Sequence, residues 1–232
     1  MTNHEILVTG ASSGIGEALV YRLARRGYAL LITGRSRERL AQVASTAHQF
    51  GSPLRVLPGD LRDTAFVEEL LTLVEHTRDL TAIVNSAGIG RFGATPDFSS
   101  EHWRELLHVN LSVPFALIQA AARRQLHDNV FTVINVSSDA DTLGFRDAAA
   151  YCGSKGALLS MSRALQAELR TKNMRVCVIS PGRVDTRFNN RLPGDRPGAL
   201  AADHVAEVIE FALTCSPNIE LTEIRLDSMQ RA

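Results

Sequence analysis

The sequence predicts a single-domain α/β fold in which a parallel sheet of about seven strands carries helices on both faces. Three observations support this prediction. Short apolar runs alternate with amphipathic helical segments and short loops along the chain. The first apolar run leads directly into a glycine-rich loop and a helix. The chain has 232 residues, 45% of them hydrophobic, so it can bury one substantial core.

Composition and charge narrow the functional classes. The formal net charge is zero and neither half carries a block of like charge, which argues against a nucleic-acid or anionic-membrane partner. Cys152, Cys177 and Cys215 are odd in number and lack a CxxC spacing, so we expect neither a disulfide framework nor a metal site. The chain begins with polar residues, and no apolar run approaches the roughly 18 residues of a membrane span. These features predict a cytoplasmic protein with no membrane partner.

The first strand is expected at residues 6–8, where a short apolar run suits burial on both faces of a sheet. The loop 9–16 follows, and then a helix that reaches about Arg26 and is ended by Gly27. A Walker-type phosphate loop needs Lys and then Ser or Thr after its last glycine, but Glu17 stands at that position. The loop is therefore not a Walker loop.

Two other interpretations of this loop remain. A hydrolase nucleophile elbow fits the spacing around Ser12, with Asp185 and His204 in triad order. However, only eleven residues precede Ser12, too few for the upstream loop that supplies an oxyanion donor. A dinucleotide site fits better, because glycines allow close backbone approach to a pyrophosphate and the helix N-terminus supplies amide donors. The residues expected at the cofactor are Gly10, Ser12, Ser13, Gly14, Ile15 and Gly16.

The second strand is expected at residues 29–32, followed by a helix from Ser36 to about Phe50. In dinucleotide folds an acidic residue at the end of this strand selects the free 2′-hydroxyl, and an arginine accommodates a 2′-phosphate. This chain has no acid there, but it has Arg35, with Arg37 close by. NADP(H) is therefore the expected cofactor, with NAD(H) as the alternative. A solvated arginine at the start of the helix is the competing interpretation of Arg35.

The third and fourth strands are expected at residues 54–57 and 82–84. Asp60, followed by Leu61, either contacts the adenine amino group or caps the helix that begins near Asp63. The small residues from Asn85 to Gly88 follow the fourth strand and again permit close backbone approach at a carboxyl end.

A long helix is expected from about Ser99 to Leu126, with Asn110 in its middle. Asparagine is unfavourable inside a helix because its amide competes for backbone groups. Together with its apolar neighbours and the following Pro114, it predicts a distorted, buried segment in which Asn110 serves a site.

The next strand, 130–136, delivers Ser137 and Ser138, and a helix that continues to about Thr171 follows. Tyr151 and Lys155 stand four residues apart on this helix, so their side chains project from one face. Lys155 is one of only two lysines in the chain. Either an arginine-rich composition explains this ratio, or the position needs a compact ammonium that a guanidinium cannot replace.

The remaining elements are a strand at 174–180, a helix at 203–214 and a last strand near 221–226. Residues 183–200 are expected to form a mobile substrate lid, rich in Asn, Pro, Gly and Arg. Two interpretations of its four arginines stay open, namely a solvated lid and a site for an anionic substrate. These residues are Arg183, Arg187, Arg191 and Arg196.

Six motifs in this order and spacing resemble the short-chain dehydrogenase/reductase family in its short single-domain form. They are Thr9 to Gly16, Asn85-Ser-Ala-Gly88, Asn110, Ser138, Tyr151-x-x-x-Lys155 and Pro181-Gly-x-Val-x-Thr186. The resemblance spans residues 5 to 226. It implies a Rossmann-like, doubly wound sheet, a nicotinamide cofactor, and reversible hydride transfer between that cofactor and a small carbonyl or alcohol substrate.

The resemblance also implies a role for particular residues. Tyr151 would act as general acid/base, Lys155 would hold the nicotinamide ribose, Ser138 would bind the substrate oxygen, and Asn110 would anchor a relay water. Further cofactor contacts would come from Asn85, Ala87, Gly88, Tyr151, Lys155, Pro181, Gly182, Val184 and Thr186. The long helices around Asn110 and Tyr151 would form the interfaces of a homodimer or homotetramer.

The chemistry requires a tyrosine that gives up its proton near neutral pH. A free tyrosine has a pKa of about 10, so the pKa must fall by roughly 3 units, or about 4 kcal/mol. We expect the Lys155 ammonium and the positive charge of the oxidised nicotinamide to supply this shift. A catalytically silent, NADP(H)-binding regulatory protein is the alternative function. The intact set of four residues argues against that alternative.

Some residues depart from the family pattern. Ser86 stands where a second asparagine is common, and Asp141 stands where a small residue is usual; we expect Asp141 at the rim of the pocket. No basic residue precedes Gly14, so the NADP(H) preference depends on Arg35. Leu143, Phe145 and Phe188 are expected to line the substrate pocket beside Ser138 and Tyr151.

Overall fold

The computed structural model describes residues 4–124 and 130–230 and contains a seven-stranded, all-parallel sheet. The strand order is β3-β2-β1-β4-β5-β6-β9. The predicted fold class is confirmed, and each strand begins and ends within two residues of its predicted bounds. In sheet order the strands are Leu54–Pro58 (β3), Ala29–Gly34 (β2), Glu5–Val8 (β1), Leu80–Asn85 (β4), Phe131–Val136 (β5), Met174–Pro181 (β6) and Glu223–Leu226 (β9).

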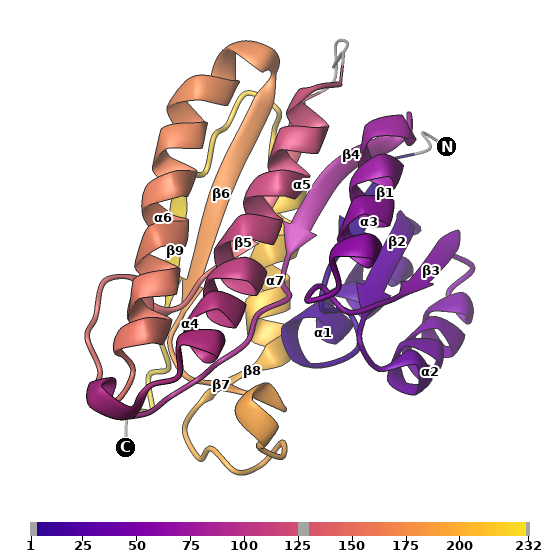
Figure 1. Ribbon diagram of the computed structural model, residues 1–232. Helices are drawn as coiled ribbons and strands as arrows, with labels where there is room; N and C mark the ends of the chain where they lie inside the picture. Colours follow the sequence, from indigo (N-terminus) through magenta and orange to yellow (C-terminus); the bar gives the residue numbers. More distant parts are fainter. Residues whose placement is uncertain (1–3, 125–129, 231–232) are drawn as a thin grey trace.

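Helices cover both faces of the sheet, because successive strand residues point to opposite sides. In β1, Ile6 and Val8 belong to one hydrophobic core, whereas Leu7 belongs to the other. Figure 1 shows α5 and α6 in front of the sheet and α7 behind it. The first core is closed by α1 (Gly14–Arg25), α2 (Arg37–His48) and α7 (Ala202–Thr214), and the second by α3 (Thr64–His76), α5 (Val113–Ala122) and α6 (Ala149–Leu169).

The predicted long helix around Asn110 is interrupted. It consists of α4 (Ser100–Leu107), a π-helical turn at His108–Ser112, and α5. The Ser99 hydroxyl accepts hydrogen bonds from the first amides of α4, as expected of a cap. The distortion predicted at Asn110 is therefore confirmed, while the predicted end at Leu126 lies outside the described residues. π-helical turns are frequent at functional sites.

This helical run also corrects one expectation. By length and apolar composition, Ser100–Ala122 could cross a membrane, contrary to the prediction that no stretch comes close. Half of its apolar window is buried inside the fold, as in the core helix of a soluble protein. The run is thus weak support for a membrane span.

The segment predicted as a lid is anchored at its base. Two short strands, β7 (Val184–Asp185) and β8 (Leu200–Ala201), pair in parallel, and a 3₁₀ turn at Phe188–Asn190 lies between them. Figure 1 shows this loop beyond the carboxyl end of β6. The segment 183–200, which we call the lid segment, is therefore a loop closed at its base by the pairing of β7 with β8.

Candidate functional site

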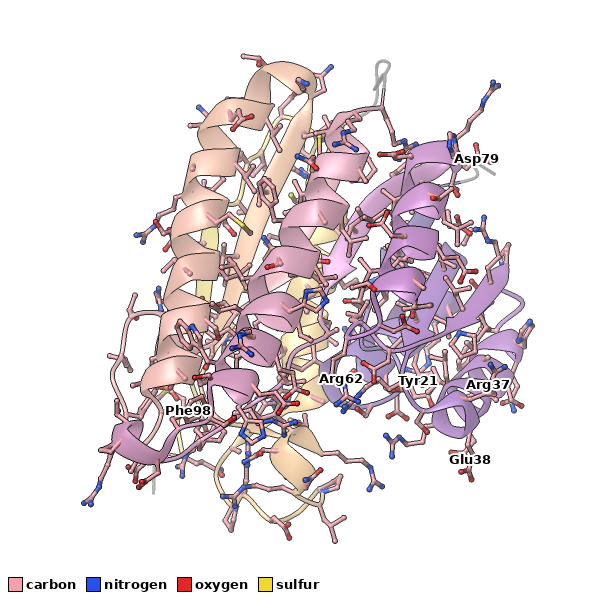
Figure 2. All side chains as sticks on the ribbon, in the orientation of Figure 1. Tyr21, Arg37, Glu38, Arg62, Asp79 and Phe98 are labelled. Atoms are coloured by element: carbon pink, nitrogen blue, oxygen red, sulfur yellow. The ribbon has the colours of Figure 1, made fainter. Side chains whose placement is uncertain are left out.

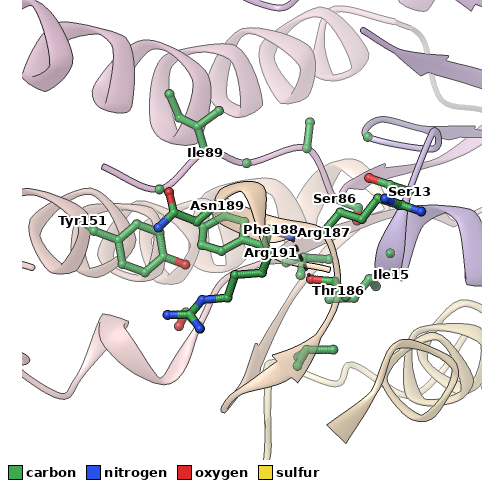
Figure 3. Close-up of a pocket in the computed structure, with 18 of the residues that line it drawn as sticks. Ser13, Ile15, Ser86, Ile89, Tyr151, Thr186, Arg187, Phe188, Asn189 and Arg191 are labelled. Carbon is green, nitrogen blue, oxygen red and sulfur yellow. Dashed lines mark hydrogen bonds between the residues drawn. The ribbon is translucent and has the colours of Figure 1, made fainter. Parts of the chain in front are cut away.

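A cleft of about 730 Å³ opens along the carboxyl ends of the strands, where ligands bind in sheets of this topology. Its floor comes from the residues that follow β1, β2, β4, β5 and β6, and the lid segment forms its outer wall (Figure 3). Most predicted site residues meet here. The predicted residues in its lining are Gly10, Ser12, Ser13, Gly14, Ile15, Arg35, Asp60, Leu61, Ala87, Gly88, Ser138, Phe145, Tyr151, Lys155, Pro181, Gly182, Val184, Thr186 and Phe188.

The glycine loop and the start of α1 form a cradle of backbone at one end of the cleft, and glycine is needed where this loop packs against the loop after β4. Gly10 has a φ of +68°, and a Cβ there would lie 2.8 Å from the backbone N and Cα of Ala87. Gly14, with a φ of +60°, begins α1, and the side chain of the N-cap residue Ser13 makes no capping hydrogen bond. The first amides of α1 and their positive dipole end thus face the cleft, which suits a pyrophosphate.

Gly16 has a different role from the one predicted. It does not line the cleft; a Cβ at this position would lie 2.5 Å from the carbonyl oxygen of Gly10. The glycine therefore lets α1 pack closely under the loop.

The hydrolase interpretation of the loop fails on geometry. Ser12 lines the cleft, but neither Asp185 nor His204 does, so the described residues assemble no triad there.

One end of the cleft is strongly cationic. Arg35 and Arg39 line it, and neither has a carboxylate within ion-pair distance among the described residues. Arg37, the other arginine considered from the sequence, projects outward from the start of α2 (Figure 2) and lies outside the cleft. Arg39 was missed, although its spacing of four residues from Arg35 at a helix start is the signal that indicates it.

Of the two predicted uses of Asp60, the structure tests only the helix cap. Its carboxylate pairs with Arg62, with Nη2 to Oδ2 at 2.6 Å, which lowers the pKa of Asp60. The cap of α3 is Asp63, whose Oδ1 accepts from the amide of Ala65, so the interpretation of Asp60 as the cap is wrong. Asp60 does line the cleft, and Arg62 orients its carboxylate.

Asn85 and Asn110 lie outside the cleft lining. The amide of Asn85 donates to Asn135 at 2.8 Å in the core, at the end of β4. The amide of Asn110 donates to the Ile89 carbonyl and to Ser154 Oγ, and its oxygen accepts from the Ile89 amide. Asn110 therefore ties the β4 loop to α6.

Three of the four predicted catalytic side chains converge at the other end of the cleft. Tyr151 and Lys155, which are 9% and 4% exposed, both face it from α6, as their spacing predicts. Ser138 extends from the end of β5, and its hydroxyl donates to the Asp139 carboxylate at 2.9 Å. Lys155 Nζ donates to the Val136 carbonyl at 3.0 Å. The burial of Lys155 supports the interpretation that this position needs a compact ammonium.

Burial is the main influence on the pKa values of Tyr151 and Lys155. Burial raises the pKa of Tyr151 to about 12, and the neighbouring Ser138 hydroxyl acts in the opposite direction. Burial lowers the pKa of Lys155 to about 8, against the attraction of Asp141. The protein alone therefore does not bring Tyr151 close to neutrality, and the expected lowering needs the charge of a bound cofactor.

Asp141 is not at the rim of the pocket. Its side chain is fully buried, accepts from Ser180 Oγ at 2.6 Å and forms an ion pair with Arg225 at 2.9 Å. The expectation failed because Arg225 lies 84 residues further along the chain. The pair joins the turn after β5 to the edge strand β9.

Aromatic rings wall the catalytic end. Phe92 and Phe188 flank the Tyr151 ring, with centroids 5.3 and 5.8 Å away. Phe145 lies at the mouth, but Leu143 is 54% exposed and does not line the cleft, so the predicted substrate set loses one member. Phe92 was not predicted, because an aromatic residue in a glycine-containing loop carries no periodic signal.

Residues 4–197 match the family described as short chain dehydrogenase. An uncharacterised oxidoreductase of Staphylococcus aureus is 30% identical over 226 residues, which are 97% of this chain and 96% of that protein. An alcohol dehydrogenase from the archaeon Thermococcus sibiricus, complexed with 5-hydroxy-NADP, is 28% identical with a TM-score of 0.89 over 99% of this chain and 98% of its own. A metagenomic short-chain oxidoreductase in complex with NADP is 27% identical, with a TM-score of 0.82 and 99% of both chains covered.

Proposed function

The chain belongs to the short-chain dehydrogenase family, and on this premise we propose that it is an NADP(H)-dependent oxidoreductase acting on a carbonyl or secondary alcohol. The observation that carries the proposal is one cleft with a backbone cradle for a pyrophosphate at one end and Ser138, Tyr151 and Lys155 at the other. The bound nicotinamide would donate or accept the hydride.

The residues present fit this cofactor. The amides at the start of α1 would hold the pyrophosphate, and Gly10 lets the loop that carries them pack against the backbone of Ala87. Arg35 and Arg39 would bind a 2′-phosphate, because phosphate is recognised well by guanidinium groups that lack another partner. The NADP compounds carried by the two similar solved structures support this preference over NAD(H).

Tyr151 would donate the proton to the substrate oxygen in reduction and accept it in oxidation. Ser138 would hydrogen-bond the same oxygen, which requires its hydroxyl to turn away from Asp139. Lys155 keeps two donors after its bond to Val136, and these would hold the ribose hydroxyls. Its positive charge would favour the tyrosinate that forms during reduction.

Asn110 would act by positioning. Its amide hydrogens are both used, on Ile89 and Ser154. An anchored relay water would therefore bind to its remaining oxygen lone pair or to a carbonyl that the π-helical turn leaves free.

Substrate would be enclosed by the segment 183–200, with Phe145, Phe188 and the unpredicted Phe92 as apolar walls. Trp103 and Phe115 on the α4 to α5 run are 40% and 42% exposed, which supports burial of this face in a homodimer or homotetramer. Light scattering of the purified protein would decide the oligomeric state.

A panel of aldehydes, ketones and secondary alcohols, assayed with NADP(H) and NAD(H), tests the proposal. We expect turnover of at least one class and a higher kcat/KM with NADP(H). Tight NADPH binding with no turnover of any member would instead identify a catalytically silent, cofactor-binding regulatory protein. Absence of binding of either cofactor would refute both.

A further inference from the structure

Four arginines of the lid segment line the cleft without a carboxylate partner. Arg183, Arg187, Arg191 and Arg196 all belong to its lining. None of them has an acidic side chain within 4.0 Å among the described residues, whereas arginines elsewhere, such as Arg22 and Arg163, are paired. The two acids in the lid segment are turned to the backbone: Asp185 Oδ2 accepts from the Gly194 amide and Asp195 Oδ2 from the Leu192 amide.

Three of the four guanidinium groups lie at two different places along the cleft. In Figure 3, Arg187 lies near Ser13 and Thr186, where the pyrophosphate cradle is, and Arg191 points toward Tyr151. Arg196 also acts at this second place, because its charge works to lower the pKa of Tyr151. A cofactor phosphate thus accounts for Arg187 but not for Arg191 and Arg196.

Arg196 is held in place and is only partly solvated. Its Nη1 donates to the Val184 carbonyl at 2.9 Å, at the strand pair that anchors the lid segment. Burial lowers its pKa, and repulsion from Arg191 adds to this effect against the attraction of Asp185. Arg196 is half-buried and the neighbouring Arg191 is exposed, and an anion bound between them would offset both the desolvation of Arg196 and the repulsion between the two charges.

We propose that the substrate carries an oxyanion, a carboxylate or a phosphate, and that Arg196 and Arg191 bind this group beside the carbonyl presented to Tyr151. This inference rests on the proposed oxidoreductase function. Guanidinium groups suit this task because they bind carboxylate and phosphate through two parallel hydrogen bonds. The aromatic rings of Phe92 and Phe188 then enclose the carbon chain between the anion and the carbonyl.

The test uses pairs of carbonyl compounds that differ only in charge. Levulinate and acetoacetate are compared with their methyl amides, and dihydroxyacetone phosphate with dihydroxyacetone, all with NADPH. We expect kcat/KM at least tenfold higher for the anion in a carboxylate or phosphate pair, and the pair that shows it identifies the oxyanion. Equal or higher kcat/KM for the neutral member of every pair would overturn the proposal.

Two variants test whether the preference for anionic substrates comes from Arg196. In Arg196→Gln, we expect the ratio of kcat/KM for the anion to kcat/KM for its neutral partner to fall about tenfold. Arg104→Gln is the control, because Arg104 is an exposed arginine on α4 outside the cleft. An unchanged preference in Arg196→Gln would overturn the assignment of this residue.

A binding measurement separates this inference from the proposed function. Levulinate and its methyl amide are titrated into the NADP⁺-bound protein, and the shift in Tm is recorded. A shift with levulinate that Arg196→Gln abolishes, without turnover of any compound, would support the anion site and refute the oxidoreductase. Turnover of neutral carbonyls with no shift in Tm on addition of levulinate would support the oxidoreductase and refute the anion site.

Discussion

The buried ion pair between Asp141 and Arg225 predicts an unequal response to removal of either partner. The Asp141 side chain is 0% exposed, whereas that of Arg225 is 41% exposed. Arg225→Ala therefore leaves a carboxylate without water, while Asp141→Asn leaves a guanidinium that solvent reaches. Because the carboxylate is the more deeply buried partner, Arg225→Ala should destabilise the protein more than Asp141→Asn.

The magnitudes follow from the contacts. Removal of one partner of a buried pair costs about 3–5 kcal/mol. The bond from Ser180 and the nearby charge of Lys155 still stabilise the carboxylate, so we expect Arg225→Ala to lower the free energy of unfolding by about 2–3 kcal/mol. Asp141→Asn keeps the shape and an acceptor oxygen, and should cost about 1 kcal/mol.

Urea unfolding followed by circular dichroism measures these differences. The double variant Asp141→Asn/Arg225→Ala should be about as stable as Asp141→Asn, because it contains no uncompensated carboxylate. Arg163→Ala is the matched control: its pair with Glu223 lies at the same strand but is exposed, and its loss should cost under about 1 kcal/mol. A larger loss of stability in Asp141→Asn than in Arg225→Ala would refute this reasoning. So would a double variant whose loss of stability equals the sum of the two single losses.

Three further predictions concern the two ends of the cleft. Arg35→Ser should weaken NADPH binding by about 10- to 100-fold, because it removes a charge-assisted hydrogen bond of roughly 1.5–3 kcal/mol. Fluorescence titration should show unchanged NADH binding. An equal loss of affinity for NADH would contradict the role of Arg35. Gly10→Ala should lower the free energy of unfolding by about 2 kcal/mol or more, because the positive φ of Gly10 and its approach to Ala87 leave no room for a Cβ. Gly144→Ala is the control, since a Cβ there would lie in open space and should change the stability little. Near-native stability of Gly10→Ala would contradict this reasoning. The pKa of Lys155 is about 8 in the folded protein and 10.5 as its ordinary value, so between these pH values the unfolded chain binds more protons at this residue, and Lys155 should add roughly 3 kcal/mol to the free energy of unfolding as the pH rises. Burial raises the pKa of the Cys177 thiol and acts in the opposite direction, so the prediction concerns the difference between the wild type and Lys155→Met, which should change with pH by this amount. Parallel pH curves for the two proteins would disprove the assignment.

The sheet and its cofactor loop were predictable because the signals are local. Strands buried on both faces appear as short apolar runs, such as Ile6 to Val8, and glycines mark the turns between them. The spacing of Tyr151 and Lys155 predicts a shared helix face, and both residues do face the cleft. The apolar surroundings of Asn110 likewise predicted the distorted helix.

The predictions that failed depend on interaction partners that are far apart in the sequence, or that cannot be told from another partner by spacing alone. Arg225 stands 84 residues from Asp141, so the loop alone gave no reason to bury that aspartate. Arg62, two residues from Asp60, offered a pairing that spacing does not distinguish from capping. The two-residue strands that anchor the lid segment are too short to produce a periodic pattern.

The depth at which the Tyr151 phenol is buried could not be predicted either. A sequence shows which charge stands four residues away, but it does not show how deeply the phenol is buried. In the structure, burial outweighs the favourable neighbours and raises the pKa to about 12. The balance between desolvation and charge requires coordinates.

Replacement of Tyr151 by phenylalanine tests the central claim most directly. The change removes only the hydroxyl, so the ring keeps its contacts with Phe92 and Phe188 and the fold should be retained. Turnover with the best substrate of the panel and the affinity for NADPH are measured on the same preparation. We predict that the turnover rate falls by about a hundredfold or more, as expected when a general acid is removed, while the affinity for NADPH changes less than about threefold. Turnover at the wild-type rate would contradict the proposed role of Tyr151.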